Sequence, residues 1–248
     1  MTAATARDWL RCYRPRPAAR LRLVCFPYAT GSATFYRSWA GALPEHVELV
    51  AVQYPGRLDR ISEPCVPDME TMVDTVAGVL PPVLDRPVAL FGHSMGAAIA
   101  FEVAHRLRAR YGVDPVRLYV SGRPAPEYHE NGVKHRGPDD VLWAELSRLG
   151  GTSAEVLDHA DLRAALMPAL RGDYRLIETY RPVPAQPLPC PITALLGDAD
   201  PEVTPVQAGA WAGHTTAGLT LKVFPGNHFY LVDHRAAVLA EVVRGLES

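Results

Sequence analysis

The segment Gly92-His93-Ser94-Met95-Gly96 has the residue types and spacing of a reactive serine. The apolar run over 88–91 predicts a short buried strand before it, and apolar residues at helical spacing over 97–110 predict a helix after it. A Gly-x-Ser-x-Gly turn between a strand and a helix is typical of a nucleophile elbow, which sets the serine hydroxyl above the sheet edge near the positive end of the helix. Only residues without a β-carbon fit at the two ends of so tight a turn. This context favours a catalytic serine over an ordinary tight turn.

A serine hydroxyl becomes a strong nucleophile when a histidine accepts its proton and a carboxylate orients that histidine. Downstream of Ser94, Asp198 and Asp200 follow one apolar run, and His228 lies in a loop after the last one. The order serine, acid, histidine is that of α/β-hydrolases. We predict that Asp200 is the orienting acid, because it stands deeper in its loop and can reach toward His228. Asp198 directly follows the strand and remains the alternative, although it could simply cap the next turn.

Acyl chemistry at a serine also needs an oxyanion hole, which is formed by two backbone N–H groups. The amide of Met95, immediately after the nucleophile, is the first predicted donor. The loop 27–32 follows the first long apolar run and has small residues, and we predict that Ala29 in this loop is the second. His93 is expected to point away from Ser94 and to be structural. The remaining histidines are expected to be solvated or to lie on helix faces, namely His46, His105, His129, His135, His159 and His214.

The elements that must position these loops alternate along the chain. Apolar runs predict strands at 21–26, 47–54, 88–91, 118–121, 192–196 and 219–224, with a further edge strand over 9–13. Helical patterns cover 33–43, 69–84 and 97–110 between them. Strands that alternate with helices form a parallel sheet covered on both faces, and such strands are continuous apolar runs. We therefore predict an α/β fold of the α/β-hydrolase type with a mostly parallel central sheet.

Residues 124–189 interrupt the alternation, because they are too many for one crossover. Helical patterns cover 139–149, 154–159 and 162–180, and a proline-rich return follows. We interpret this segment as a helical lid inserted after the sixth strand position of the fold, with 1–123 and 190–248 as the hydrolase core. A helical subdomain that only buries its own core is the alternative. The residues expected to line or close the substrate pocket are Tyr28, Leu142, Trp143, Leu146, Leu166, Leu170 and Phe229.

The composition limits the classes of function. A formal net charge of −2 and 48% hydrophobic residues describe a soluble globular protein and exclude a strongly basic nucleic-acid binder. The first residues lack the layout of a signal peptide, and no apolar run reaches membrane-spanning length. The four cysteines are scattered without paired metal-ligand spacing. We expect a cytoplasmic protein with reduced thiols, no metal site and no cofactor.

Over nearly its whole length the chain resembles the discrete type II thioesterases that accompany polyketide synthases and nonribosomal peptide synthetases. The oxyanion loop over 26–33, the Tyr-Pro-Gly-Arg signature over 54–57 and the elbow are similar to motifs of that family. So are the acid loop over 197–200, the histidine loop over 226–229 and an acidic-aromatic pair, Asp173-Tyr174, in the lid. Thr30 and Asn227 depart from the family pattern, since each replaces a glycine. Neither change removes a catalytic group.

The resemblance implies a stand-alone, monomeric enzyme that hydrolyses acyl groups from the phosphopantetheine arm of acyl or peptidyl carrier proteins. Such an enzyme clears misprimed or stalled units from an assembly line. Carrier proteins are acidic around the attachment serine, so Arg57 and Arg60 are expected to dock the carrier, with solvated surface charge as the alternative. A small-molecule carboxylesterase would use the same triad, and a catalytically inactive binding protein could share the fold.

Overall fold

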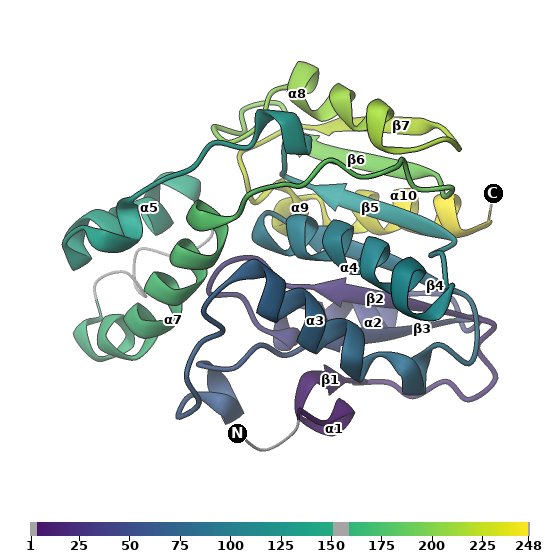
Figure 1. The fold of residues 1–248 in the computed structure, drawn as a ribbon, viewed down its shortest axis with the longest axis horizontal. Helices are drawn as coiled ribbons and strands as arrows, with labels where there is room; N and C mark the ends of the chain where they lie inside the picture. Colours follow the sequence, from purple (N-terminus) through teal and green to yellow (C-terminus); the bar gives the residue numbers. More distant parts are fainter. Residues whose placement is uncertain (1–3, 151–158, 248) are drawn as a thin grey trace.

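A seven-stranded sheet forms the centre of the computed structural model, which describes residues 4–150 and 159–247. The strand order is β1-β3-β2-β4-β5-β6-β7 (Figure 1). Strand β1 (Leu10–Arg11) pairs antiparallel with β3, and all other neighbouring strands are parallel. The parallel strands are β2 (Leu21–Phe26), β3 (Val47–Val52), β4 (Val88–His93), β5 (Arg117–Ser121), β6 (Ile192–Gly197) and β7 (Leu219–Phe224). The predicted α/β-hydrolase architecture is confirmed.

Both faces of the sheet are covered, which explains the continuous apolar runs. Side chains of successive strand residues point to opposite faces. Accordingly, Val24 and Leu90 belong to one hydrophobic cluster, whereas Leu23 and Phe91 belong to another. Every residue of β3, β4 and β6 is buried. Edge strand β7 is largely exposed until Phe224 at its end.

Different helices cover the two faces of the sheet (Figure 1). The first cluster receives side chains from α1 (Ala6–Trp9), α3 (Met69–Val79), α4 (Met95–Tyr111) and α8 (Pro205–Gly209). The second receives side chains from α2 (Arg37–Ala42), α9 (Tyr230–Asp233) and α10 (Arg235–Glu247). Helix α3 ends earlier than the predicted 69–84, because prolines at 81 and 82 cannot donate backbone hydrogen bonds to continue it. In the described part of the chain, no helix is both long and apolar enough to cross a bilayer.

The segment 124–189 contains α5 (Asp139–Leu149) and α7 (Ala160–Thr179). Figure 1 places both helices on the left, beyond the carboxyl ends of the central strands. Counted along this chain, the segment follows β5, the fifth strand, and not a sixth, because only the short β1 precedes β2 in the described residues. Most of the helical pattern over 154–159 lies outside the described residues.

The passage from β4 into α4 depends on direct contact between backbones. A β-carbon added at Gly92 would lie 2.1 Å from the carbonyl oxygen of Gly96. One added at Gly96 would lie 2.1 Å from the carbonyl oxygen of Phe26 and 2.5 Å from that of Pro27. Real β-carbons do not approach oxygen atoms so closely, so both glycines are required by packing.

We expect Gly96→Ala to destabilise the protein by about 3 kcal/mol or more, because the obstructing atoms belong to the backbone of the adjacent strand end. The matched control is Gly41→Ala in α2, where an added β-carbon meets no atom within 4 Å. The control should be neutral or stabilising by up to about 1 kcal/mol. Urea unfolding measures both values, and equal stability of the two variants would contradict the packing argument.

Candidate active site

Ser94 lies at the junction of β4 and α4 in a strained backbone conformation. Its φ of 55° and ψ of −118° place it in a region that residues with a β-carbon rarely adopt. Such conformations cost about 1–3 kcal/mol and persist where surrounding contacts impose them. Here the Ser94 N–H donates to the carbonyl of Ser121 at 2.8 Å, and the Ser94 carbonyl accepts from Ala97 N–H at 3.0 Å. The geometry is that of the predicted nucleophile elbow.

His228 and Asp200 form a buried contact. The distances from His228 Nδ1 to the two carboxylate oxygens of Asp200 are 3.0 and 2.9 Å, and these side chains are only 1% and 0% exposed. A second bond from Glu202 N–H, at 2.9 Å, holds Asp200 Oδ1. With Nδ1–H donating to the carboxylate, Nε2 of His228 is the basic nitrogen. Nε2 is buried and has no hydrogen-bond partner within the described residues, so it is available to accept a proton.

Asp198 has a different role in the same loop. Its Oδ1 accepts a hydrogen bond of 2.9 Å from Gly226 N–H, and the residue is exposed. The carboxylate therefore links the end of β6 to the turn that carries His228. Between the two acids that the sequence left open, Asp200 is the one in contact with the histidine.

A buried polar chain supports His228 from the side of β5. His93 Nδ1 lies 2.9 Å from Ser121 Oγ, which lies 2.6 Å from the hydroxyl of Tyr230. The rings of His93 and His228 are 4.8 Å apart between centroids. Burial, with a smaller effect of nearby His228, holds the pKa of His93 well below its usual range. His93 therefore stays neutral and does not repel a proton on His228, consistent with the structural role predicted for it.

Gly122 makes room for both imidazoles. Its φ is +59°, and a β-carbon there would lie 2.7 Å from His93 Cε1 and 3.0 Å from His228 Cε1. Sequence reasoning missed this glycine. Its position directly after the predicted strand over 118–121 was the available signal.

Ser94 opens into a cavity of about 520 Å³, within the size range of small-molecule sites. Ala29 and Met95, whose amides are the predicted oxyanion donors, line the same cavity. Met95 is the first residue of α4, where backbone N–H groups have no acceptor within the helix. The two candidate donors and Ser94 therefore line the same cavity.

Thr30, next to Ala29, is held by a residue of α7 that is 143 positions away along the chain. Its φ is +66°, and its N–H donates to Asp173 Oδ2 of α7 at 2.7 Å. Asp173 also accepts two hydrogen bonds from the Arg57 guanidinium, both at 2.8 Å. Although burial alone would lower the pKa of Arg57, the charge of Asp173 raises it. Removing one partner of such a buried pair typically costs about 3–5 kcal/mol, because the other charge is left unpaired.

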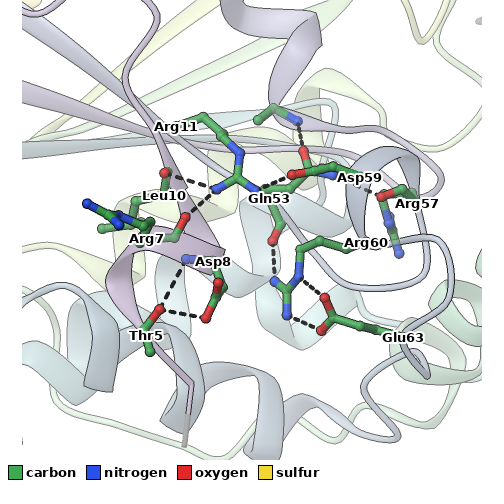
Figure 2. Close-up of polar contacts among 11 residues, drawn as sticks. Thr5, Arg7, Asp8, Leu10, Arg11, Gln53, Arg57, Asp59, Arg60 and Glu63 are labelled. Atoms are coloured by element: carbon green, nitrogen blue, oxygen red, sulfur yellow. Dashed lines mark hydrogen bonds and ion pairs between the residues drawn. The ribbon is translucent and has the colours of Figure 1, made fainter. Parts of the chain in front are cut away.

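The expectation that Arg57 and Arg60 dock a carrier protein is wrong, since both are buried. Arg57 is 3% exposed and is occupied by Asp173. Arg60 is 7% exposed, pairs with Glu63 and donates to the carbonyl of Gln53 at 2.8 Å (Figure 2). Its guanidinium also lies over the Trp9 ring. Neither guanidinium is available to a partner surface.

The predicted pocket residues lie elsewhere than expected. Leu142, Trp143, Leu146 and Leu170 are buried against one another in the small core between α5 and α7, and Leu166 packs on that core. Tyr28 and Phe229 stack edge to face at 4.8 Å beside His93 and do not line the cavity. Two amphipathic helices are stable together only when their apolar faces pack against each other. In α5 and α7 these are the faces that were predicted to contact substrate.

The cavity lining is more polar than expected. It includes Arg123, Glu130, Asn131, Lys134, Glu178, Glu202, Thr204 and Gln207. Arg123 donates to His129 Nδ1 at 2.6 Å, and His129 Nε2 faces the carbonyl of Tyr180 at 3.1 Å. Burial, together with the Arg123 charge, lowers the pKa of His129 to about 4. His129 is therefore a neutral cavity residue and not the solvated histidine that was predicted.

The loops of the site also meet α5. A β-carbon at Gly150, which ends this helix, would lie 2.5 Å from Asn227 Nδ2. Asn227 Oδ1 in turn accepts from Phe229 N–H at 2.8 Å, next to His228. No cluster of three or more histidine, cysteine or acidic side chains over residues 4–150 and 159–247 is arranged to hold a metal ion.

Comparison with known proteins identifies several relatives. The family model described as Thioesterase domain matches residues 21–246. The chain is 46% identical over 242 residues to the "Probable cadicidin biosynthesis thioesterase" of Streptomyces griseus, covering 98% of this chain and 67% of that protein. It is 42% identical over 226 residues to "Thioesterase PikA5" of Streptomyces venezuelae, covering 91% and 80%. Among solved structures, the type II thioesterase BorB from the borrelidin biosynthetic cluster superposes with a TM-score of 0.90 at 47% identity, covering 96% of this chain and 98% of that one.

The different roles of Asp198 and Asp200 can be tested by replacing each carboxylate with an amide. Asp200→Asn should lower kcat by about 10³–10⁴, because the amide no longer favours the His228 tautomer with a basic Nε2. Asp198→Asn is the matched control and should have a much smaller effect, since its oxygen can still accept from Gly226 N–H. Steady-state kinetics on one ester substrate decide between them. The reverse order of effects would assign the orienting role to Asp198.

Proposed function

The chain belongs to the thioesterase family, and from this premise we propose that it hydrolyses acyl groups from the phosphopantetheine arm of acyl or peptidyl carrier proteins. Ser94, His228 and Asp200 are the catalytic residues of the proposal. The buried contact between His228 and Asp200 is the observation that carries it, because this contact leaves a basic nitrogen on a ring that packs 4.8 Å from the ring of His93, the residue before Ser94. The proteins named above are biosynthetic thioesterases, which supports an assembly-line substrate.

In the first step, Ser94 Oγ attacks the thioester carbonyl while His228 Nε2 takes the serine proton. Asp200 holds the imidazole in the required tautomer and stabilises the imidazolium. The carbonyl oxygen becomes an oxyanion, to which the N–H groups of Met95 and Ala29 donate. When the tetrahedral intermediate collapses, the carbon–sulfur bond breaks, and the proton on His228 passes to the departing pantetheine thiolate.

In the second step, a water molecule replaces the thiol. His228 takes a proton from that water as its oxygen attacks the acyl-serine ester. The same two amides stabilise the second oxyanion. Collapse of this intermediate returns the proton to Ser94 Oγ and releases the carboxylic acid. No further group is needed for the balance of atoms and charge.

The polar lining of the cavity supports an amide-bearing arm as the group that occupies it. A pocket for a lipid chain is lined mainly by apolar side chains, whereas this one includes charged and amide side chains around Ser94. A phosphopantetheine arm has two amides and a hydroxyl group, which can hydrogen-bond to such a wall. We therefore propose that the cavity is the channel of the arm.

We also propose that residues 124–189 act as the lid of the hydrolase core formed by 1–123 and 190–248. Of the described residues that line the cavity, more than half belong to this segment, including Tyr174 and Ile177 of α7. Covering the serine excludes bulk water until substrate is bound.

Ser94→Ala should abolish turnover while the fold persists, since alanine keeps the β-carbon but removes the attacking oxygen. We expect a loss of roughly 10⁴–10⁶ in kcat, as for other triad members. Circular dichroism checks the fold, and labelling of the wild type by a fluorophosphonate checks that Ser94 is the nucleophile. Retention of more than a tenth of the activity would contradict an acyl-enzyme mechanism.

The carrier-bound substrate can be tested with one acyl group on three supports. We expect kcat/KM to be higher for the acyl-carrier protein than for the same acyl group on a truncated pantetheine or as a nitrophenyl ester. The reason is that contacts along the arm and the carrier contribute binding energy to the transition state. Ser94→Ala serves as the blank in each assay. A preference for the nitrophenyl ester would favour a small-molecule carboxylesterase.

A further inference from the structure

We propose that Asp173 of α7 is a positioning residue, which holds the loop 27–32 in the geometry that aims the Ala29 N–H at the substrate oxyanion. This inference rests on the proposed function, because it takes Ala29 as an oxyanion donor. It adds that the direction of the Ala29 N–H depends on a residue of the proposed lid segment and not on the hydrolase core alone.

The loop contains a tight turn whose conformation is unfavourable for this sequence. The Gly31 N–H donates to the carbonyl of Tyr28 at 2.9 Å, which closes a four-residue turn. Thr30 is the third residue of that turn and has a φ of +66°. A positive φ at this position, without one at Ala29, is typical of a type II turn, which normally has glycine or asparagine there. Threonine is β-branched, so the turn needs an outside contact to remain in this conformation.

Asp173 provides that contact at the strained residue itself. Its Oδ2 accepts from Thr30 N–H at 2.7 Å, so the peptide group between Ala29 and Thr30 is fixed in orientation. The Gly31–Tyr28 bond closes the turn around it. The Ala29 N–H belongs to the same planar peptide group as the Tyr28 carbonyl, so the bond from Gly31 N–H to that carbonyl also sets the direction of the Ala29 N–H.

Arg57 in turn orients the carboxylate. Its two terminal nitrogens bind one oxygen each of Asp173 at 2.8 Å, in the bidentate geometry that fixes a carboxylate most firmly. Arg57 Nη1 also donates to the carbonyl of Gly31 at 3.1 Å. The side chains of Asp173 and Arg57 are each 3% exposed, so water does not compete for these bonds. The pair thus holds the turn at two successive residues.

The decisive experiment compares Asp173→Ala in two backgrounds, the natural Thr30 and Thr30→Gly, because alanine removes the acceptor of the Thr30 N–H, whereas an asparagine oxygen could still accept from it. With Thr30 present, we expect kcat to fall about 10- to 100-fold with KM nearly unchanged, less than the loss typical of removing an oxyanion donor. Affinity for a trifluoromethyl ketone, which forms an oxyanion on reaction with the serine, should fall in parallel. In the Thr30→Gly background the loss should be much smaller, because glycine adopts the positive φ without outside support.

The matched control is Asp139→Ala, which removes another carboxylate bound to an arginine of α7, Arg171, without contact to the loop. Its kcat should equal that of the wild type. If Asp173→Ala does not fold, Asp173→Glu keeps the charge for Arg57 but displaces the oxygen from Thr30 N–H, and it should show the same rescue by Thr30→Gly. An unchanged kcat, or an equal loss in both backgrounds, would overturn the proposal.

The assays are run on a nitrophenyl ester and on an acyl-carrier protein. If the wild type cleaves only the ester, the proposed carrier substrate is wrong, but the role of Asp173 is still decided by the ester kinetics. If both substrates are cleaved and the rescue is absent, the proposed function stands and the positioning role is wrong.

Discussion

The site depends on a contact between bare backbones at the elbow. Gly96 lies against the carbonyls of Phe26 and Pro27, and Gly92 lies against Gly96. Because no side chain separates them, the end of β2 and the start of α4 are held at van der Waals distance. The serine, the first amide of α4 and the loop after β2 therefore form one wall. The acid loop follows β6 and the histidine loop follows β7. Because these strands are parallel, both loops lie at the same edge of the sheet.

The segment 124–189 is joined to this wall by specific contacts at Thr30 and Asn227, the two positions where the family resemblance predicts glycine. Thr30 is bound by Asp173 of α7, and Asn227 lies against the end of α5 at Gly150. Each position is beside a residue of the proposed catalytic machinery. Helices α5 and α7 therefore contact the loop that follows β2 and the loop that carries His228.

The members of the proposed triad could be found in the sequence because their signals are local. Each candidate follows an apolar run, and parallel strands bring such loops to one edge. Chain order therefore selected Ser94 and His228 and limited the acid to Asp198 or Asp200, and contact with His228 in the structure favours Asp200. The roles of Arg57 and Arg60 could not be predicted in this way. The partner of Arg57 is 116 residues away along the chain, and an arginine in a loop has the same pattern whether it is solvated or buried. Trp143 and Leu146 illustrate the same limit, because an apolar helix face does not reveal whether it meets a ligand or another helix.

The strain at Thr30 also has a consequence for how this sequence could have arisen. Glycine at position 30 would adopt the positive φ without support, whereas threonine there relies on the acceptor that Asp173 supplies. The buried pair with Arg57 constrains position 173 for its own reason, so threonine adds a second constraint to the same side chain. Substitutions at positions 30 and 173 should therefore not be additive in their effect on the loop. A change from glycine to threonine at position 30 would cost less in a chain that already has the acid and its arginine than in one that lacks them.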